Sequence, residues 1–220
     1  MKSEKLLSIV VPYRNREEHL GKFIPYMEEF FAKSHIPYHI WVIHQLGDKP
    51  FNRAKLLNVG YRLSDSSDYH AFHDVDMLPV DSDYSYIDAP THLASQVEQF
   101  GWGLPYEGYF GGVTLFNKHD FARINGYSNN YWGWGAEDDD LFTRCIIAGL
   151  SPCRKECRYV SLSHKKASLE NYHDNLTQVR KLRADPTEAR VMADGLSTLD
   201  YSKKSQTDLT DHATIVGVDL

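Results

Sequence analysis

Short β-branched runs alternate with amphipathic segments through the first third of the chain, and this alternation limits the possible folds more than any other feature. Strand-like runs cover Ser8–Pro12, Tyr38–His44 and Tyr69–His73. Between them, Glu17–Lys33 and Phe51–Leu63 repeat apolar side chains near helical spacing. This order is typical of parallel βαβ units with right-handed crossovers. The pattern predicts an α/β fold with a Rossmann-like, mostly parallel mixed sheet flanked by helices.

The remainder of the chain is less regular. We expect loops with a short helix in residues 80–108 and a loop at Asn125–Gly135. Further strands are expected at Tyr109–Phe116, Tyr159–Ser163 and Ala213–Val218, and helices at Lys118–Ile124, Ala136–Leu150 and in parts of 165–193. No repeat or low-complexity linker interrupts the chain, so residues 1–220 are interpreted as a single domain.

Composition excludes several functional classes. The chain has 220 residues, with 24 Lys plus Arg against 30 Asp plus Glu, which gives a formal net charge of −6. A protein that coats nucleic acid needs clustered positive charge, so we expect no nucleic-acid partner. No run of about 18 apolar residues exists, so no transmembrane span is expected, whereas peripheral contact with a membrane stays open.

The cysteines indicate a compartment. Cys145, Cys153 and Cys157 cannot all pair within one chain, and no export signal precedes the first expected strand. We therefore interpret them as reduced thiols and expect a cytoplasmic protein. Alternatively, Cys153, Cys157 and His164 would supply three zinc ligands, but their spacing is loose and no fourth ligand is evident.

Two aspartates, Asp74 and Asp76, follow the third expected strand. Ligands of α/β proteins bind at the carboxyl ends of the strands. Two carboxylates so close together are costly unless a cation compensates them, and hard oxygen ligands suit Mg²⁺ or Mn²⁺. The simpler alternative is a solvated acidic turn.

The string Trp132–Asp140 (WGWGAEDDD) places four acids at an expected helix start. A helix dipole tolerates acids there, and one or two would suffice for capping. Glycines on both sides of Trp134 favour a lid that closes over a ligand.

Basic residues follow the first strand and begin the second helix. Arg14, Arg16 and Arg53 suit bidentate contacts to phosphate, although ordinary polarity at a helix start is an equal alternative. His164 follows a later expected strand and is a candidate metal ligand, although a lone histidine is more often structural.

Together these features describe a site with a metal on strand-end carboxylates, arginines for a diphosphate and further carboxylates for base catalysis. A nucleotide-diphosphate-sugar transferase requires this combination. One alternative is a phosphohydrolase with Asp74 as its nucleophile, although such enzymes carry the two aspartates on the first strand. Another is a sugar-binding module without catalysis.

These residues resemble the catalytic domain of the β-1,4-galactosyltransferase family, which is glycosyltransferase family 7 of the GT-A type. The motifs that carry the resemblance are VPYRNREEHL (Val11–Leu20), FNRAKLLNVGY (Phe51–Tyr61), DVD (Asp74–Asp76), YFGGV (Tyr109–Val113), NGYSNNYWGWGAEDDD (Asn125–Asp140) and DGLSTLDY (Asp194–Tyr201). They span nearly the whole chain in the family's order, and WGWG-x-EDDD is the most specific of them.

The resemblance implies a GT-A fold and an inverting transfer of galactose from UDP-galactose to O4 of a sugar, forming a β-1,4-linked galactoside. It implies Mn²⁺ as cofactor, with Mg²⁺ as the alternative, and an acceptor of the N-acetylglucosamine, glucose or xylose type. Two alternatives to this function stay open. In the first, the donor is another UDP-hexose such as UDP-N-acetylgalactosamine. In the second, the chain binds a UDP-sugar and does not catalyse its transfer.

The resemblance also implies roles for single residues. Positions that would hold the nucleotide or the donor sugar are Pro12, Arg14, Arg16, Phe51, Arg53, Asp74, Val75, Tyr109, Gly112 and Trp134. Asp138 would be the general base, Glu137 would touch the donor sugar and Asp139 would grip the acceptor. Asp76 and His164 would bind the metal. Trp134 would be the ring of the lid, and Tyr109 stands where a bulky tyrosine favours galactose over N-acetylgalactosamine.

The chain departs from the family pattern at several places. Ser161 replaces a methionine ligand of the vertebrate members, and Lys166 stands where the proteoglycan-linker type has a histidine. Both changes bear on the preference for Mn²⁺. Gln99 replaces a lysine that assists the donor phosphate. The family's disulfide cysteines and Golgi anchor have no counterpart, which agrees with a cytoplasmic expectation, and the region Arg180–Ala184 does not reveal the acceptor.

Overall fold

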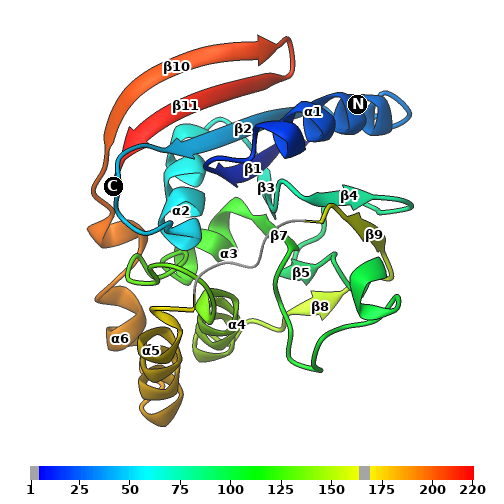
Figure 1. Ribbon diagram of the computed structural model, residues 1–220. Helices are drawn as coiled ribbons and strands as arrows, with labels where there is room; N and C mark the ends of the chain where they lie inside the picture. Colours follow the sequence, from blue (N-terminus) through cyan, green and yellow to red (C-terminus); the bar gives the residue numbers. More distant parts are fainter. Residues whose placement is uncertain (1–4, 164–168) are drawn as a thin grey trace.

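Four parallel strands form the centre of the main sheet in the computed structural model, which describes residues 5–163 and 169–220 (Figure 1). They are β11 (Ala213–Asp219), β2 (Tyr38–Gln45), β1 (Leu7–Tyr13) and β3 (Tyr69–His73), adjacent in that order. Every residue of β1 is buried, as expected for a strand with both faces covered. The mostly parallel α/β sheet predicted from the first 73 residues is confirmed.

Antiparallel strands extend this sheet on both sides. β10 (Ser202–Thr210) pairs with β11 at one edge, and β7 (Val113–Asn117) pairs with β3 at the other. β5 (Thr91–His92) and β8 (Cys153–Arg154) follow, which gives the order β10-β11-β2-β1-β3-β7-β5-β8. A smaller sheet joins β4 (Met77–Pro79), β9 (Arg158–Ser161) and β6 (Gln96–Val97).

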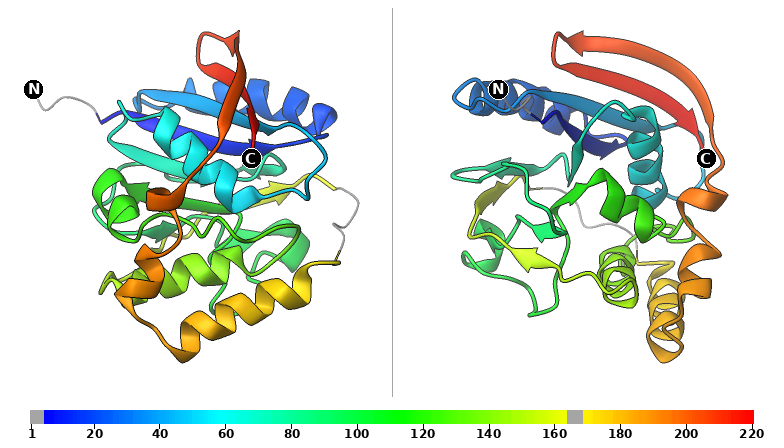
Figure 2. Two further views of the ribbon diagram at one scale, coloured as in Figure 1. Left: turned by 90° about the vertical axis from the view of Figure 1, so that its left-hand side faces the viewer. Right: turned by 180° about the vertical axis from the view of Figure 1, so that it is seen from behind.

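Helices cover both faces of the main sheet because alternate residues of its strands point in opposite directions. Ile9 and Val11 belong to the core beneath α1 (Glu17–Phe31), with Phe23 and Met27 from that helix. Val10 belongs to the opposite core, beneath α2 (Arg53–Leu63). The two helices lie on opposite sides of the sheet (Figure 2).

The remaining helices lie in the second half of the chain. They are α3 (Lys118–Arg123), α4 (Glu137–Ile147), α5 (Tyr172–Ala184) and α6 (Glu188–Met192), with 3-10 turns η1 (Glu98–Phe100) and η2 (Leu196–Thr198). α4 and α5 pack side by side below the sheet (Figures 1 and 2). Among the described residues, no helix is both long enough and apolar enough to cross a membrane.

The strand expected at Tyr109–Phe116 begins only at Val113. Gly112 has a φ of +76°, a left-handed conformation that interrupts an extended strand and that favours glycine. β10 was not predicted, because its residues are almost all exposed and polar and show no apolar alternation. Pro12 does not end β1. Pairing of β1 with β3 stops at Val10, so the proline lies where only β2 still pairs.

Candidate active site

The ends of β1 and β3 and the starts of α2 and α4 supply the candidate site. Asp74 directly follows β3, and its backbone N–H donates to the carbonyl of Gly112 at 3.0 Å. Arg53 is the first residue of α2, and the side chain of Asn52 caps that helix by accepting from Lys55 N at 2.8 Å. Glu137 and Asp138 stand in the first turn of α4. Strand ends and helix starts therefore converge, as the topology of an α/β sheet predicts.

Arg53 joins the carboxylates of this site. Its Nε donates to Asp74 Oδ1 at 2.6 Å and its Nη1 to Asp138 Oδ1 at 2.9 Å, while Glu137 Oε1 lies 3.6 Å from Nη1. The Arg53 side chain is only 12% exposed. Burial alone would lower the pKa of Arg53, but Asp138 and Asp74 outweigh burial and raise the pKa well above its usual value. The guanidinium is thus a permanent positive charge among three acids.

Asp138 has the electrostatics of a base that retains a proton easily. Burial raises its pKa well above the usual aspartate value, Arg53 lowers it in part, and Glu137 and Asp74 raise it further. Burial likewise raises the pKa of Glu137. Among the protein groups of the site, burial and like charge therefore outweigh the positive charge of Arg53.

Gly111 leaves room for the two groups that meet at this point. A Cβ atom there would lie 2.3 Å from Asp138 Oδ2 and 2.7 Å from the hydroxyl of Tyr109. Both distances are far below a normal contact, so any side chain at this position would displace the Asp138 carboxylate or the Tyr109 phenol. The phenol of Tyr109 and the carboxylate of Asp138 therefore face the same small volume above the backbone.

The last two acids of the string point elsewhere. Asp139 accepts from Arg183 Nη2 at 2.8 Å and from the Tyr106 hydroxyl at 3.3 Å. Asp140 is buried and accepts from Arg144 Nε at 2.5 Å and from the Tyr131 hydroxyl at 2.9 Å. Two of the acids thus face Arg53, one faces α5, and one is structural.

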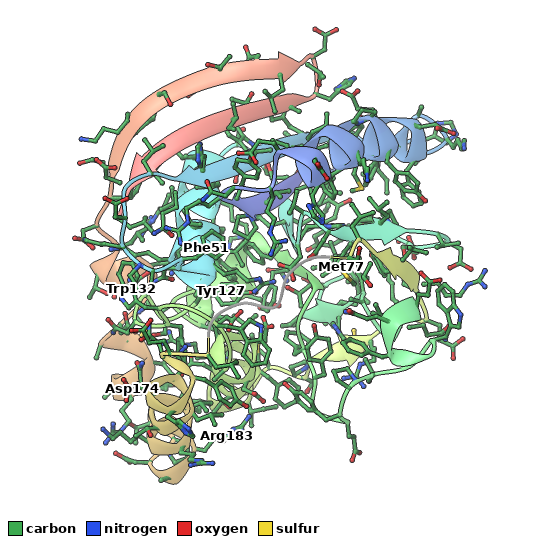
Figure 3. All side chains as sticks on the ribbon, viewed as in Figure 1. Phe51, Met77, Tyr127, Trp132, Asp174 and Arg183 are labelled. Carbon is green, nitrogen blue, oxygen red and sulfur yellow. The ribbon has the colours of Figure 1, made fainter. Side chains whose placement is uncertain are left out.

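The residues expected to hold the nucleotide lie at the start of α2 and the end of β1. Arg14 lies 5.4 Å from the centre of the Phe51 ring, and its Nη1 donates to the carbonyl of Lys49 at 2.6 Å. The Phe51 carbonyl accepts from Gly133 N at 2.8 Å, so the tryptophan loop touches this region, and Figure 3 shows Phe51 and Trp132 on the same side of the molecule. The remaining positions of the set are Pro12 and Val75, which are buried, and Arg16, which precedes α1.

The ring of Trp134 is 51% exposed and lies 5.2 Å from the ring of Tyr172 on α5. Asn175 Nδ2 donates to the carbonyls of Trp132 and Trp134, at 3.0 and 3.3 Å. The glycines on both sides have positive φ, at 74° for Gly133 and 100° for Gly135. The loop is therefore fastened to α5 in this conformation, and its role as a lid stays a prediction.

The predicted metal site is described only in part. The carbonyl of Asp76 accepts from Leu162 N at 2.8 Å, and Met77 pairs with Ser161 across β4 and β9, so these two segments lie together. His164 lies outside the described residues. In the described part of the chain, no three His, Cys, Asp or Glu side chains form a metal cluster. Asp76 supplies the hard carboxylate oxygen that Mn²⁺ and Mg²⁺ accept, and it fits that expectation.

The cysteines of the alternative zinc interpretation have separate neighbours. Cys153 Sγ lies 3.1 Å from Thr91 Oγ1, and the Cys157 sulfur accepts from Asp83 N at 3.4 Å. The third ligand of that interpretation is again His164, which is not among the described residues.

Two side chains at the site were missed from the sequence. Arg183 and Tyr106 bind Asp139 from segments that are distant in the chain. No local pattern links either residue to Asp139, so only the tertiary structure reveals them. By contrast, the spacing of Asp140 and Arg144 by four residues on a helix was a readable signal for a pair.

Comparisons with known proteins agree with this geometry. A family model described as the N-terminal region of glycosyl transferase group 7 matches residues 1–88, and one described as the N-terminal domain of galactosyltransferase matches residues 91–165. Human β-1,4-galactosyltransferase 1 is 40% identical over 206 residues, which cover 89% of this chain and 50% of the human protein. Bovine β-1,4-galactosyltransferase 3 is 39% identical over 210 residues, covering 90% of this chain and 52% of that protein. The chain spans about half the length of these relatives.

Solved structures are similar over nearly the whole chain. The catalytic domain of Drosophila β1,4-galactosyltransferase 7 with xylobiose superposes with a TM-score of 0.76 at 30% identity, covering 98% of this chain and 94% of that chain. A mutant of the same Drosophila enzyme with manganese, UDP-Gal and xylobiose has a TM-score of 0.79 over the same shares. A Pyrobaculum mannosyltransferase at 14% identity shares the fold alone, with a TM-score of 0.57 over 88% of this chain and 66% of that chain. The chain therefore has a GT-A fold and belongs to the β-1,4-galactosyltransferase family, glycosyltransferase family 7.

Proposed function

We propose that the protein transfers galactose from UDP-galactose to a hydroxyl of a sugar acceptor, forms a β-1,4 linkage and requires a divalent metal. The observation that carries this proposal is the cluster of Arg53, Asp74, Glu137 and Asp138, with Tyr109 above it. Family membership and the Drosophila complex, which contains manganese and UDP-Gal, support the donor and the metal.

Asp138 is the general base in this proposal. Its carboxylate takes the proton of the acceptor hydroxyl as that oxygen forms a bond to the anomeric carbon, and UDP leaves from the opposite face with the electron pair of the broken bond. The raised pKa of Asp138, caused first by burial, makes its carboxylate a stronger base than an exposed aspartate. Arg53 holds Asp138 at 2.9 Å and keeps its orientation fixed.

The donor lies along the end of β1 and the start of α2. Arg14 and Phe51 are already in contact there, and they bind the nucleotide. Asp76 and His164 would hold the metal, which would supply positive charge to the diphosphate of the leaving group. Asp74 and Glu137, which both contact Arg53, would lie at the donor sugar.

The acceptor enters beside Asp139. Its partners Arg183 and Tyr106 offer charge and an aromatic face, which suit a sugar. The Drosophila relative contains xylobiose, so acceptors of the xylose type are tested beside N-acetylglucosamine and glucose.

Release of UDP from UDP-galactose with Mn²⁺, measured with and without each acceptor, tests the proposal. We expect release to depend on the acceptor and to stop when EDTA removes the metal. Asp138→Asn should lower kcat by about 10²- to 10⁴-fold, because proton transfer is lost, while calorimetry shows UDP-galactose binding nearly unchanged.

Asp211→Asn, in the exposed turn between β10 and β11, is the matched control and should retain full turnover. Binding of UDP-galactose without turnover under every condition would point instead to a sugar-binding module. Retained turnover in Asp138→Asn would refute the assignment of the base.

A further inference from the structure

The segment that carries Tyr109 has little regular structure of its own. Residues 105–108 are exposed, and residues 104–112 belong to no helix or strand. Nevertheless Tyr109 is half-buried, and its hydroxyl lies 2.7 Å from the position that a Cβ of Gly111 would take, beside Asp138. Something outside the segment must therefore hold the phenol in place.

Arg154 on β8 makes that connection from a neighbouring strand. Its Nη2 donates to the carbonyls of Glu107 and Tyr109, at 3.2 and 2.9 Å. Its Nε donates to His92 Nδ1 at 3.1 Å. β5 and β8 pair in parallel with His92 opposite Arg154, so the sheet register brings these two side chains together.

His92 continues the connection to the far side of Tyr109. Its ring is completely buried, and Nε2 lies 2.8 Å from the carbonyl of Gly111. A guanidinium only donates and a carbonyl only accepts, so the imidazole is neutral with its proton on Nε2. Burial lowers the pKa of His92 to about 4, which agrees with a neutral ring at pH 7.

The backbone carbonyls on both sides of Tyr109, and its own, are thus fixed by one chain of hydrogen bonds that begins at Arg154. The His92 ring also packs against the Tyr109 ring edge to face, with centres 5.5 Å apart. The position of the phenol above the reacting carboxylate therefore depends on Arg154 and His92, neither of which needs to touch the substrate.

We propose that Arg154, acting through His92 and the carbonyls of residues 107, 109 and 111, is a positioning residue that sets how strictly the site discriminates between donor sugars. This inference rests on the proposed galactose transfer and adds a specificity determinant to it. UDP-N-acetylgalactosamine carries a bulkier acetamido group where UDP-galactose has a hydroxyl. The resemblance assigns Tyr109 to the discrimination between these two donors, so a phenol that is no longer held beside Asp138 should discriminate between them less strictly.

The test measures kcat and KM of the wild type and of Arg154→Ala with UDP-galactose and with UDP-N-acetylgalactosamine. We expect the ratio of kcat/KM to shift toward UDP-N-acetylgalactosamine by about fivefold or more, in the range that one small group contributes to selectivity. The Kd of UDP alone should not change, because Arg154 binds His92, Glu107 and Tyr109, none of which is expected to hold the nucleotide.

Arg158→Ala is the matched control. Arg158 is a similarly exposed arginine on β9, paired with Asp81, and its removal should leave the donor ratio unchanged. Arg154→Lys keeps the charge but cannot bind His92 and the two carbonyls together, so it should shift the ratio in the same direction by less.

An equal loss with both donors, or an unchanged ratio in Arg154→Ala, overturns the inference while the proposed function stands. A wild type that turns over neither donor overturns the proposed function and this inference with it. A shift of the same size in Arg158→Ala also counts against the positioning role, because it would trace the effect to surface charge.

Discussion

Arg53 contributes to folding and to the chemistry of the site through the same contacts. It brings together carboxylates from the end of β3 and the start of α4, which lie far apart in the chain. Without a cation, three acids at this separation would repel one another in partly buried surroundings. The Arg53 side chain thus stabilises a cluster of acids that would otherwise lower the stability of the folded protein.

Replacing it by Arg53→Met should destabilise the protein at pH 7 by about 3–5 kcal/mol, because the remaining acids lose their buried partner. Urea unfolding measures this. The loss should shrink at pH 5, because Asp138 and Glu137, with raised pKa values, take up protons there and the repulsion falls. An equal loss at both pH values would contradict the electrostatic explanation.

The sequence predicted correctly that a strand end and a helix start bear acids, but it did not show which group each arginine faces. Arg53 begins a helix after a strand, a position that suits a phosphate as well as a carboxylate. Its observed contacts are carboxylates. The choice depends on distances between α2 and α4 that no local pattern encodes. Arg14, by comparison, lies beside Phe51, and the resemblance assigned both residues to the nucleotide.

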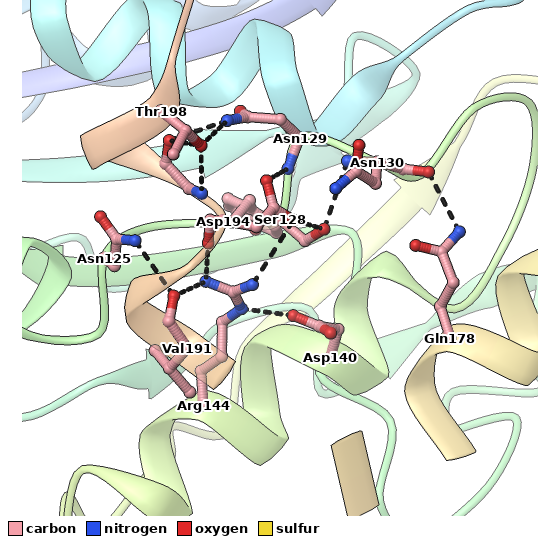
Figure 4. Close-up of polar contacts among 12 residues, drawn as sticks. Asn125, Ser128, Asn129, Asn130, Asp140, Arg144, Gln178, Val191, Asp194 and Thr198 are labelled. Carbon is pink, nitrogen blue, oxygen red and sulfur yellow. Dashed lines mark hydrogen bonds and ion pairs between the residues drawn. The ribbon is translucent and has the colours of Figure 1, made fainter. Parts of the chain in front are cut away.

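At the scale of elements, α4 is anchored from its buried side. Figure 4 shows Arg144 between Asp140 on the same helix and the segment of Val191 and Asp194. Arg144 Nη1 donates to the Asp194 carbonyl at 2.8 Å, and the carboxylate of Asp194 accepts from Ser128. Burial raises the pKa of Asp140, and Arg144 opposes that rise. These contacts fix the helix whose first turn carries Asp138.

A double-mutant cycle measures this anchor. Arg144→Met alone should cost about 3–5 kcal/mol of unfolding free energy, because Asp140 is left buried without its partner. In the Asp140→Asn background the same change should cost at least about 1 kcal/mol less, since the buried charge of Asp140 is no longer left without a partner. Urea unfolding of the wild type, the two single mutants and the double mutant gives the coupling free energy between Arg144 and Asp140.

Glu29, in the last turn of α1, and Lys33, just beyond the end of that helix, form the control pair, with the same spacing of four residues but highly exposed side chains. Their coupling should not exceed about 0.5 kcal/mol. Equal coupling in the two pairs would mean that burial is not the cause.

Some elements could be predicted and others could not, for physical reasons. β1 is buried throughout and α2 is buried from Ala54 to Tyr61, and both carry apolar side chains at the expected spacing, so they were found within a few residues. β10 has no apolar side and exists because β11 offers it hydrogen-bonding partners. Such an element is specified by its neighbour and not by its own side chains.

At the scale of the whole molecule, buried neutral histidines link stability to pH. Burial lowers the pKa of His70 to about 3 and of His73 and His92 to about 4. In the unfolded chain these rings titrate near their ordinary value of 6.5. Below pH 6.5 the unfolded state therefore binds protons that the folded state does not. Their contribution to stability is complete above pH 6.5 and is lost as pH falls toward 4.

Between pH 6 and 5 these three groups should lower the unfolding free energy with a slope approaching about 4 kcal/mol per pH unit, at about 1.4 kcal/mol for each proton. Urea unfolding from pH 7.5 to 5 measures the slope. His70→Gln retains a partner for the Ser64 hydroxyl, which lies 3.0 Å from His70 Nε2. This variant should reduce the slope by about 1.4 kcal/mol per pH unit, which is the contribution of one proton. An equal slope in the wild type and in His70→Gln would contradict the prediction.

The hairpin of β10 and β11 has a consequence for association between molecules. β11 fills the outer side of β2, whose buried residues include Ile40, Val42 and Ile43. β10 then forms the rim, bearing Lys203, Lys204 and Asp208 in place of apolar side chains. Charged rims discourage strand addition from another chain. A version truncated after residue 201 would present an uncapped apolar ladder to its neighbours and should form insoluble aggregates at concentrations where the intact chain stays dispersed.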